Sequence, residues 1–312
     1  MFDYLKSYLD FKRQSRSELG IGNIQFYNWW NIRREEIWLY KFITERKILN
    51  QSSRVIRFIS VFGNPSVINH FDNTLNIFYT GENVHTKYHS LYSDNMINNK
   101  KCHLSLGFDL YENEKYIRLP LWIMYMFSPN SSAEEIKYRC EQLRYPCIGE
   151  KKKFASLIAR YDWNGVRTNI YNSLSSIGDI DCPSMLLHND DSLVNKFNDN
   201  KKDYLQQYYF NICPENTNAY GYVTEKLFEA IDSGCIPIYW GSYNRPELDV
   251  LNLDSIIMWN YDSKSIYNQV SELVNNKNML DDFITQPRLN KYAEEFVLDI
   301  FNQLENKLRN LV

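Results

Sequence analysis

Two adjacent charged residues, Glu225 and Lys226, follow a polar loop that runs from Pro214 to Gly221. The loop comes after an apolar run and before a segment with helical spacing, so the pair stands in or just after the first turn of a predicted helix. Free backbone N–H groups at a helix start favour an anion, most often a phosphate. A carboxylate and an ammonium side by side at such a turn could hold ribose hydroxyls and a pyrophosphate.

The elements on either side of this loop predict a strand–loop–helix–strand unit. Tyr208 to Cys213 alternates aromatic and β-branched residues, which favours a buried strand. Apolar residues then recur at the three- and four-residue spacing of one helix face: Val223, Leu227, Phe228 and Ile231. Gly234 ends the helix, and Cys235 to Tyr239 forms a second strand, parallel to the first by the right-handed crossover rule. An ordinary β-α-β unit with a solvated Glu-Lys pair has the same spacing, so both interpretations stay open here.

The residues themselves add a likeness to a known family. The run FNICPENTNAYGYVTEKLFEAIDSGCIPIYWG, residues 210–241, closely resembles the donor-binding motif of α-1,3-fucosyltransferases (glycosyltransferase family 10), above all the bacterial members. Four earlier stretches resemble parts of the same enzymes in the same order: Asn28-Trp29-Trp30, IFYTGEN (Ile77–Asn83), GFDLYENEKYIRLPL (Gly107–Leu121) and FASLIARYDWNGVRTNIYNSL (Phe154–Leu174). The resemblance therefore covers roughly residue 25 to the C-terminus.

This resemblance implies both a fold and a reaction. The expected fold is α/β, with two Rossmann-like domains facing each other across a cleft (the GT-B architecture). The expected enzyme is an inverting fucosyltransferase that moves L-fucose from GDP-β-L-fucose to a glycan hydroxyl, O3 of N-acetylglucosamine, and forms an α-linkage. The acceptor would be a glycan of the N-acetyllactosamine type, as in protein glycosylation or lipopolysaccharide synthesis. Two alternatives remain: an inverting GT-B transferase that uses another nucleotide sugar, and a non-catalytic module that binds nucleotides or glycans.

By the same resemblance, five residues contact the donor: Arg167, Asn216, Tyr222, Glu225 and Lys226. Arg167 starts a predicted helix beyond the end of a strand, where a guanidinium can make bidentate contacts to a diphosphate. The alternative is a first-turn arginine that pairs with Asp162 or is solvated. Glu225 is implied as a partner for the ribose or the fucosyl ring.

Glu82 is the candidate catalytic base. It follows Gly81 just beyond a predicted strand, Leu75 to Thr80, so its carboxylate would project from the carboxyl edge of a sheet. A sugar hydroxyl that attacks a donor needs a group within hydrogen-bond reach to accept its proton. The resemblance makes the glutamate of TGEN that base, whereas the residues alone also allow a loop glutamate that caps nearby amides.

Other polar clusters predict no metal centre and no bound cofactor. His85 and His89 lie four residues apart, but no third ligand follows, and we expect two solvated loop histidines. The Asp179-Ile180-Asp181 run matches a short metal-binding pattern that arises easily by chance. Any effect of divalent cations is expected to act through the donor diphosphate. The six cysteines include no CxxC pair and are expected to be reduced.

Composition narrows the class of protein and its location. Of 312 residues, 44% are hydrophobic and 23% charged, with a net charge of −3, so no basic field for nucleic acid is present. The longest strongly apolar run, Leu119 to Phe127, is too short to span a bilayer, and the start, MFDYLKSYLDFKRQSR, is not a signal peptide. We therefore expect a cytoplasmic enzyme without a transmembrane segment, with peripheral membrane association left open.

The length allows two domains and a C-terminal helix. A charged helix and a Pro/Gly-marked, lysine-rich stretch between Glu134 and Lys153 predict the junction. The predicted parts are residues 1–150, an acceptor-binding Rossmann-like domain, and residues 151–290, a GDP-fucose-binding one. Residues 291–312 are predicted to form a helix that crosses back to the first domain.

Overall fold

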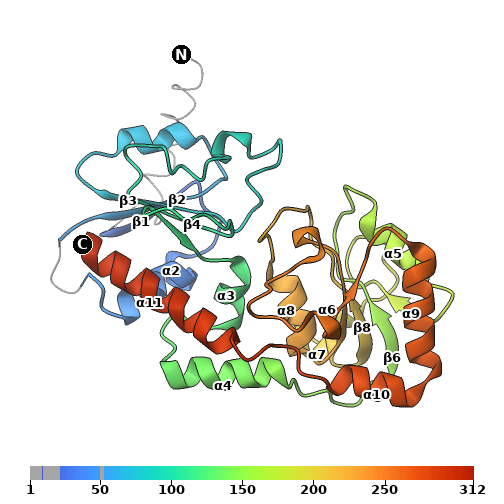
Figure 1. The fold of residues 1–312 in the computed structure, drawn as a ribbon. Coiled ribbons are helices and arrows are strands. Elements are labelled where there is room, and N and C mark those ends of the chain that lie inside the picture. Colours follow the sequence, from blue (N-terminus) through green and yellow to red (C-terminus); the bar gives the residue numbers. More distant parts are fainter. Residues whose placement is uncertain (1–8, 10–21, 50–52) are drawn as a thin grey trace. The chain divides into compact units, whose positions relative to one another are not determined.

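The computed structural model describes residue 9 and residues 22–49 and 53–312, so the charged start of the chain lies outside the described residues apart from Leu9. The chain divides into two compact units (Figure 1). Unit 1 comprises residues 1–133 and 297–312, and unit 2 comprises residues 134–296. Each unit is built on one five-stranded sheet, and every pair of neighbouring strands within a sheet is parallel.

The sheet of unit 1 has its strands in chain order. They are β1 (Ile24–Tyr27), β2 (Ile56–Ile59), β3 (Leu75–Tyr79), β4 (Leu104–Gly107) and β5 (Tyr116–Arg118), in the order β1-β2-β3-β4-β5. All residues of β3 and β4 are buried, because strands of a parallel sheet are covered on both faces. The links after β2 and β3 contain only short 3-10 helices, η3 (Pro65–His70) and η4 (Ser90–Tyr92). Unit 1 is therefore a parallel α/β sheet with reduced helices, and among the described strands it lacks the reversal of strand order that defines the predicted Rossmann-like type.

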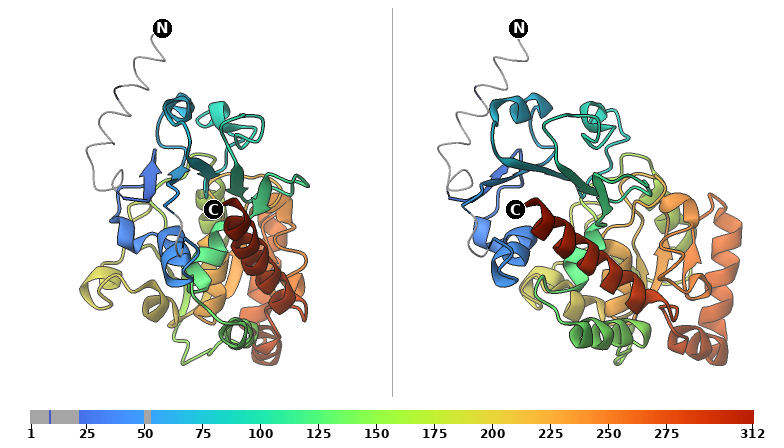
Figure 2. Two further views of the ribbon diagram at one scale, coloured as in Figure 1. Left: turned by 90° about the vertical axis from the view of Figure 1, so that its left-hand side faces the viewer. Right: turned by 60° about the vertical axis from the view of Figure 1, so that its left-hand side comes forward.

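Longer helices of unit 1 pack with the C-terminal helix. The predicted helix from Arg34 to Lys47 is split into a 3-10 turn, η2 (Arg34–Glu36), and α2 (Trp38–Glu45). α3 (Leu121–Met126) follows β5, and the last helix, α11 (Ala293–Leu311), lies beside α2 in both Figures 1 and 2. Phe301 of α11 packs edge-on against Trp38, with ring centroids 5.7 Å apart, and Arg46 Nη1 lies 2.6 Å from Glu305 Oε2. Residues 297–312 thus belong to the same compact unit as the first 133.

The sheet of unit 2 has a doubly wound strand order. Its strands are β6 (Lys153–Ser156), β7 (Ile180–Asp181), β8 (Tyr208–Ile212), β9 (Ile236–Tyr239) and β10 (Ile257–Met258). In space they run β7-β6-β8-β9-β10, so the chain moves outward from β6 in one direction and then in the other. The carboxyl ends of β6 and β8 form the topological switch point, where open α/β sheets bind ligands.

Helices cover both faces of this second sheet. α5 (Val166–Leu174) and α9 (Ser263–Asn275) pack together on one face, and α7 (Lys201–Leu205) and α8 (Glu225–Asp232) on the other (Figure 1). Unit 2 also contains α4 (Ala133–Arg144), α6 (Ser192–Asn195), α10 (Lys277–Thr285), the 3-10 helices η5 (Ser242–Asn244) and η6 (Leu253–Ser255), and the first residues of α11. The core between the sheet and the α5–α9 face is aliphatic and aromatic, with Ile170, Phe210, Ile238 and Val270 all fully buried.

The helix α4 accounts for the place at which the two units divide. The predicted boundaries follow residues 150 and 290, whereas the compact units divide after residues 133 and 296. An ion pair between Arg139 Nη1 and Asp232 Oδ1, 2.7 Å long, joins α4 to α8. Arg144, at its end, donates to the carbonyl oxygens of Leu289 and Asn290. These contacts tie α4 to unit 2.

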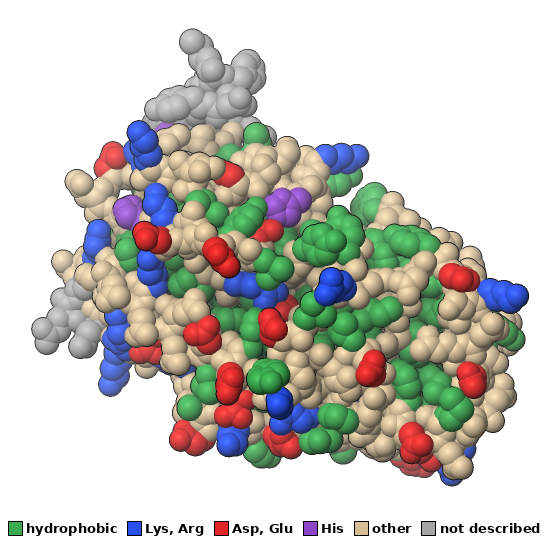
Figure 3. Space-filling view, viewed as in Figure 1, with side chains coloured by type: hydrophobic (Ala, Val, Ile, Leu, Met, Phe, Trp, Pro, Cys, Tyr) green, Lys and Arg blue, Asp and Glu red, His purple; other side chains and the backbone are tan. Residues whose placement is uncertain are grey.

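The surface charges and the helices of the described residues agree with what the composition predicts. The face drawn in Figure 3 carries acidic and basic side chains interspersed rather than one extended basic patch. Among the described residues, no helix is both long enough and apolar enough to cross a bilayer. The two parallel α/β sheets confirm the predicted fold class.

Gly234, at the end of α8, allows a test of the predicted helix end. Its φ is +68°, and an added Cβ would lie 2.6 Å from the carbonyl oxygen of Cys147. Gly149 has a similar φ of +64°, but no atom lies within 4 Å of the position of its Cβ. We expect Gly234→Ala to lower the free energy of unfolding by about 2–4 kcal/mol and Gly149→Ala by about 1 kcal/mol, because only the first adds a clash to the backbone strain. Urea unfolding followed by circular dichroism measures both, and equal losses would contradict the clash at Gly234.

Candidate functional site

The switch point of unit 2 contains a small pocket with charged walls. The pocket has a volume of about 70 Å³ and lies between the ends of β6 and β8 and the helices α7 and α8. Its charged lining residues are Arg167, Lys201, Glu225, Lys226 and Glu229. Since one water takes up about 30 Å³ in the liquid, this space fits one small anionic group rather than a large ligand. Three of the five predicted donor contacts therefore line one pocket: Arg167, Glu225 and Lys226.

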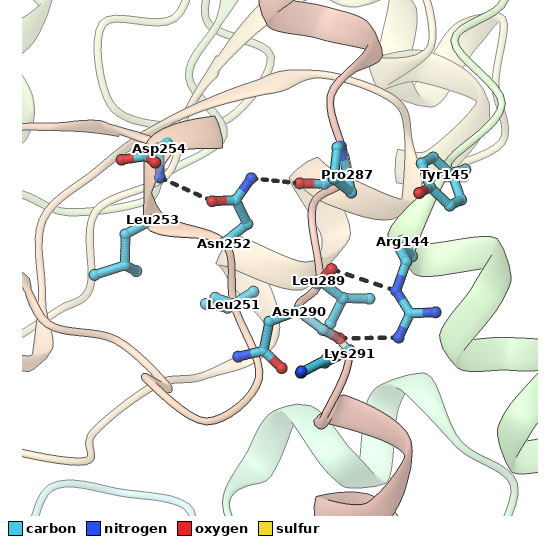
Figure 4. Close-up of a pocket in the computed structure, with 10 residues that line it drawn as sticks. All are labelled: Arg144, Tyr145, Leu251, Asn252, Leu253, Asp254, Pro287, Leu289, Asn290 and Lys291. Atoms are coloured by element: carbon cyan, nitrogen blue, oxygen red, sulfur yellow. Dashed lines mark hydrogen bonds between the residues drawn. The ribbon is translucent and has the colours of Figure 1, made fainter.

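A larger pocket elsewhere in unit 2 is less suited to chemistry. It has a volume of about 650 Å³ and is lined by the end of α4, by residues 251–254, by Pro287 and by residues 289–291 (Figure 4). Its arginine, Arg144, already donates to the carbonyl oxygens of Leu289 and Asn290 and pairs with Glu141. The polar side chain of Asn252 likewise serves the backbone, donating to the carbonyl oxygen of Pro287. We therefore place the candidate site at the smaller pocket.

Glu215 is a buried carboxylate to which the sequence prediction assigned no role. It is 1% exposed and lies in the loop after β8. Its Oε1 accepts a hydrogen bond from the backbone N–H of Thr224 at 2.7 Å, and its Oε2 accepts from the Thr224 hydroxyl at 2.7 Å. Lys226 Nζ donates to Oε2 at 3.3 Å, and the Tyr239 hydroxyl to Oε1 at 3.3 Å. Glu215 thus connects the loop, the start of α8 and β9.

A glycine makes room for this carboxylate. An added Cβ at Gly241 would lie 2.7 Å from Cγ of Glu215 and 2.5 Å from the hydroxyl oxygen of Tyr239. In the sequence, this buried carboxylate is indicated by the position of Glu215 just after Pro214, at the end of a predicted buried strand. A carboxylate buried at the end of a strand needs a cation or several hydrogen-bond donors. Its cationic partner in the structure is Lys226, eleven residues later in the sequence.

Lys226 is held as a charged ammonium by three oxygen atoms. Its Nζ lies 2.9 Å from the Thr224 hydroxyl, 3.3 Å from Glu215 and 3.5 Å from Glu225 Oε1. Burial opposes the charge, but the two carboxylates outweigh burial and raise the pKa of Lys226 above its ordinary value. Because α8 begins at Glu225, with Thr224 before its first turn, the Glu-Lys pair occupies the first two positions of the helix.

Arg167 is buried at the start of α5 and contacts the loop after β8. It is 7% exposed, and Nη2 donates to Asn216 Oδ1 at 2.8 Å and to the Pro214 carbonyl oxygen at 3.3 Å. Nη1 donates to the carbonyl oxygen of Tyr161. Asp162 does not pair with the guanidinium here; its carboxylate accepts from the backbone N–H groups of Arg167 and Thr168 and so caps α5. Burial lowers the pKa of Arg167, with Asp162 opposing the effect.

The other predicted site residues lie in two different places. Asn216 belongs to the same cluster through its bond to Arg167, and Tyr222 is 2% exposed in the loop before α8. Glu82 is in unit 1, three residues after β3, and is partly buried. Its backbone N–H donates to the Thr80 hydroxyl at 2.9 Å, which fixes the turn that carries the carboxylate. The structure therefore brings together the predicted cationic residues with Asn216 and Glu225, whereas Glu82 stands on the other unit.

The loop that carries Glu82 is also held by a histidine–aspartate pair. His85 Nε2 lies 2.6 Å from Asp109 Oδ1, and Asn95 Nδ2 donates to Asp109 Oδ2 at 2.7 Å. His85 is an exposed loop residue, as predicted, and the structure adds a partner that the sequence did not indicate, the carboxylate of Asp109 just after β4. The hydrogen bond to Asp109 raises the pKa of His85 and outweighs its burial, whereas burial alone lowers the pKa of His89.

Asp181 of the Asp179-Ile180-Asp181 motif bonds to side chains of two other strands, and most of the cysteines are buried. Asp181 Oδ2 lies 2.6 Å from Lys153 Nζ and accepts from the Tyr208 hydroxyl at 2.7 Å, so it joins three strands. The six cysteines are free thiols, and all but Cys147 are buried. In the part of the chain that the structure describes, no three His, Cys, Asp or Glu side chains are grouped so as to hold a metal ion.

Removal of Glu215 tests whether the ion pair organises the pocket. We expect Glu215→Ala to lower the free energy of unfolding by about 3–5 kcal/mol, because it leaves the Lys226 ammonium and the Thr224 donors without their partner. Tyr239→Phe removes one neutral hydrogen bond to the same carboxylate and is expected to cost about 1 kcal/mol. Urea titrations of both variants measure the difference. A Glu215→Ala protein as stable as Tyr239→Phe would rule out this organising role.

The His85–Asp109 pair predicts a dependence of stability on pH. Because the folded pKa of His85 is raised, its contribution is complete below the unfolded pKa, about 6.5, and is lost as the pH rises through the folded pKa. The urea midpoint of the wild type should therefore fall between about pH 6 and pH 8.5 more than that of His85→Gln. The effect should be small, since a third of the His85 side chain is exposed. His188→Gln, at an exposed ring that contacts Asp191, is the control and should follow the wild type.

Comparison with known proteins identifies matching family models and relatives. A model described as the alpha-(1,3)-fucosyltransferase FucT N-terminal domain matches residues 24–125, and one described as the glycosyltransferase family 10 (fucosyltransferase) C-terminal part matches residues 148–292. An alpha-(1,3)-fucosyltransferase FucT of Helicobacter pylori is 30% identical in an alignment 252 positions long, which covers 69% of this chain and 49% of that protein. The chain thus spans about half the length of this relative. An alpha-(1,4)-fucosyltransferase of Arabidopsis thaliana is 52% identical over 40 residues, 13% of this chain and 10% of that protein.

Solved structures resemble the chain over nearly its whole length. A crystal structure of an alpha1,3-fucosyltransferase matches with a TM-score of 0.60 and 22% identity. The match covers 98% of this chain and 97% of the chain in that structure. A crystal structure of an alpha1,3-fucosyltransferase with GDP-fucose has a TM-score of 0.58 and 23% identity. That match covers 96% of this chain and 97% of the other. At this identity the likeness shows the fold, and it confirms the predicted GT-B class. Because both models of one family match in order and together cover most of the sequence, the chain belongs to glycosyltransferase family 10, the fucosyltransferases.

Proposed function

We propose that the protein is an inverting α-1,3-fucosyltransferase. It transfers L-fucose from GDP-β-L-fucose to O3 of an N-acetylglucosamine residue in a glycan of the N-acetyllactosamine type. Family membership supports the reaction, and the fold likeness to an alpha1,3-fucosyltransferase crystallised with GDP-fucose supports the donor. In this proposal unit 2 binds the donor and unit 1 the acceptor, in a cytoplasmic enzyme.

One observation carries the proposal: Arg167 and Lys226 line the same small, buried pocket at the switch point of a doubly wound sheet. Departure of GDP builds negative charge on a diphosphate oxygen. Two fixed cations with little contact to water stabilise that charge more than mobile surface cations do. Both side chains are held before any ligand arrives, Lys226 by Glu215 and Arg167 by Asn216, so little reorganisation is needed during the reaction.

The remaining donor residues fit roles around that diphosphate. A phosphoryl oxygen would replace Asn216 Oδ1 on Nη2 of Arg167, which frees the Asn216 amide for the donor. Glu225, at the first position of α8, is proposed to accept hydrogen bonds from ribose or fucose hydroxyls. Tyr222 precedes that helix and is proposed to pack against the donor. Divalent cations are proposed to act through the diphosphate, without a metal site in the protein.

The chemical step proposed is a single displacement. The acceptor hydroxyl oxygen bonds to the anomeric carbon of fucose as the bond from that carbon to the β-phosphate oxygen breaks on the opposite face. The β-linked donor thereby becomes an α-linked product, and the bonding electrons leave with GDP. The proton of the hydroxyl passes to Glu82, the proposed base.

The transfer reaction tests the proposal and the base together. We expect the wild type to fucosylate N-acetyllactosamine acceptors from GDP-fucose, with the α-1,3 linkage identified by NMR. Glu82→Gln should lower kcat by roughly 10²–10⁴, because the amide cannot accept the proton. Its affinity for GDP-fucose, measured by calorimetry, should match that of the wild type.

A control and two outcomes make this test decisive. Glu114→Gln makes the same change at an exposed loop residue of unit 1 and should leave kcat unchanged. A Glu82→Gln protein with the wild-type rate would remove Glu82 as the base. Binding of UDP in preference to GDP would refute the donor.

A further inference from the structure

Charged side chains around the pocket balance one another before any ligand is bound. Three cations line it: Arg167, Lys201 and Lys226. Three carboxylates oppose them, two in the lining and one paired with the lysine of α8: Glu225, Glu229 and Glu215. Asp162, which caps α5 beside the arginine, adds further negative charge. Among the described residues, the pocket therefore has no surplus of positive charge.

This balance is unusual for a site that is proposed to receive a diphosphate. The diphosphate of a nucleotide sugar is a diester with two negative charges, and the pocket is small and largely shielded from water. Two additional negative charges in such a place are costly unless another charge changes. A proton taken up by one carboxylate of the pocket would offset one of them.

Glu229 is the carboxylate best placed to take that proton. It lies one turn after Glu225 on α8, so the two carboxylates share a face of the helix. Its side chain is 22% exposed, which leaves a route for a proton from solvent. Its partner is Lys201 of α7, whose Nζ lies 3.1 Å from Oε2 and 3.3 Å from Oε1.

The two carboxylates of α8 differ in their preference for a proton. Burial raises the pKa of Glu229 and Glu225 adds to the effect, against the opposing influence of Lys201 and Lys226. For Glu225, burial acts in the same direction, but Lys226, a backbone hydrogen bond and Lys201 together outweigh burial and lower its pKa. Neighbouring carboxyls whose pKa values are pushed apart in this way divide their tasks, one staying ionised and one exchanging a proton.

An uncharged group in the lining also favours an added proton. Asn211, at the end of β8, is 5% exposed, and its side-chain oxygen is buried without a hydrogen-bond donor. A buried acceptor without a donor costs free energy. The pocket therefore contains acceptor capacity that a water, an additional proton or a donor on the ligand would satisfy.

We propose that Glu229 takes up a proton when the diphosphate of the donor enters the pocket and releases it when GDP leaves. This inference rests on the proposed function. Protonation removes the negative partner of Lys201, so that its ammonium faces the diphosphate uncompensated, and a balanced pocket becomes positive at the moment of binding. Glu229 thereby acts as a positioning residue through Lys201, and it takes no part in the bonds that form and break.

The coupling predicts how affinity depends on pH. The bound diphosphate raises the pKa of Glu229 further, so protons are taken up in the interval between the pKa values of the free and the bound protein. Within that interval, affinity for GDP-fucose should fall as the pH rises, by up to about tenfold per pH unit for one coupled proton. Above the bound-state pKa the dependence ends.

Calorimetry measures the proton directly. GDP-fucose, whose diphosphate has no proton to exchange near neutral pH, is titrated into the full chain without acceptor and with EDTA, in PIPES and in imidazole buffer at about pH 7, because buffer phosphate would compete for the pocket. Any dependence of the observed heat on the ionisation heat of the buffer gives the number of protons taken up. We expect a clear fraction of one proton, up to one, for the wild type, with the nucleotide sugar intact afterwards by chromatography.

Two variants identify the group. Glu229→Gln keeps the shape and removes the charge, so proton uptake should vanish, the pH dependence should flatten, and binding at about pH 8 should be at least as tight as in the wild type. Glu272→Gln makes the same change on the exposed face of α9 and should retain the wild-type proton uptake.

The possible outcomes separate this inference from the proposed function. GDP-fucose binding without proton uptake, or uptake that persists in Glu229→Gln, overturns the inference and leaves the proposed donor intact. Binding that needs Mg²⁺ and takes up no proton shows that a cation supplies the missing charge, which also overturns it. An absence of GDP-fucose binding under all conditions overturns the proposed function and the inference with it.

Discussion

A buried carboxylate, Glu215, paired with a partly buried ammonium, Lys226, holds the candidate site together. Removing a charge from water is expensive, and a buried carboxylate persists only when donors surround it. Glu215 has four such donors, from Thr224, Lys226 and Tyr239. Because these come from the loop after β8, the start of α8 and β9, one side chain fixes three elements at the edge of the sheet. The glycine at 241 is needed because the Tyr239 hydroxyl and the Glu215 side chain fill the space that a Cβ would occupy.

The same pair explains why the pocket is organised but not strongly positive. Each cation that could meet a phosphate already has an oxygen partner: Lys226 has Glu215, Lys201 has Glu229, and Arg167 has Asn216. Partners hold the cations in position and also reduce their attraction for an anion. Binding of a diphosphate must therefore exchange or neutralise some of these partners. A neutral amide, such as that of Asn216, is exchanged readily, whereas a carboxylate is more easily neutralised by a proton.

Unit 1 positions its candidate base by a different device. Glu82 is held by a hydroxyl–backbone turn with Thr80, and the histidine three residues later is anchored to Asp109 beyond β4. Such local turns fix a loop at the end of a strand through contacts between residues close in sequence. The base is thus fixed by short-range contacts, whereas the phosphate pocket of unit 2 depends on contacts between distant parts of the chain.

Amino-acid pattern alone determined the family, the two parallel sheets, the strand–helix–strand unit around Glu225 and Lys226, and the place of Glu82 after a strand. These features are local: they depend on periodicity, on glycine at a helix end and on short runs of residues typical of the family. Only the tertiary structure decided the partners of the charged groups. Arg167 meets Asn216 across 49 positions of the sequence, and Asp109 reaches His85 from the segment just after β4. Burial and pairing at such separations depend on how sheets and helices pack, which no local pattern of residues encodes.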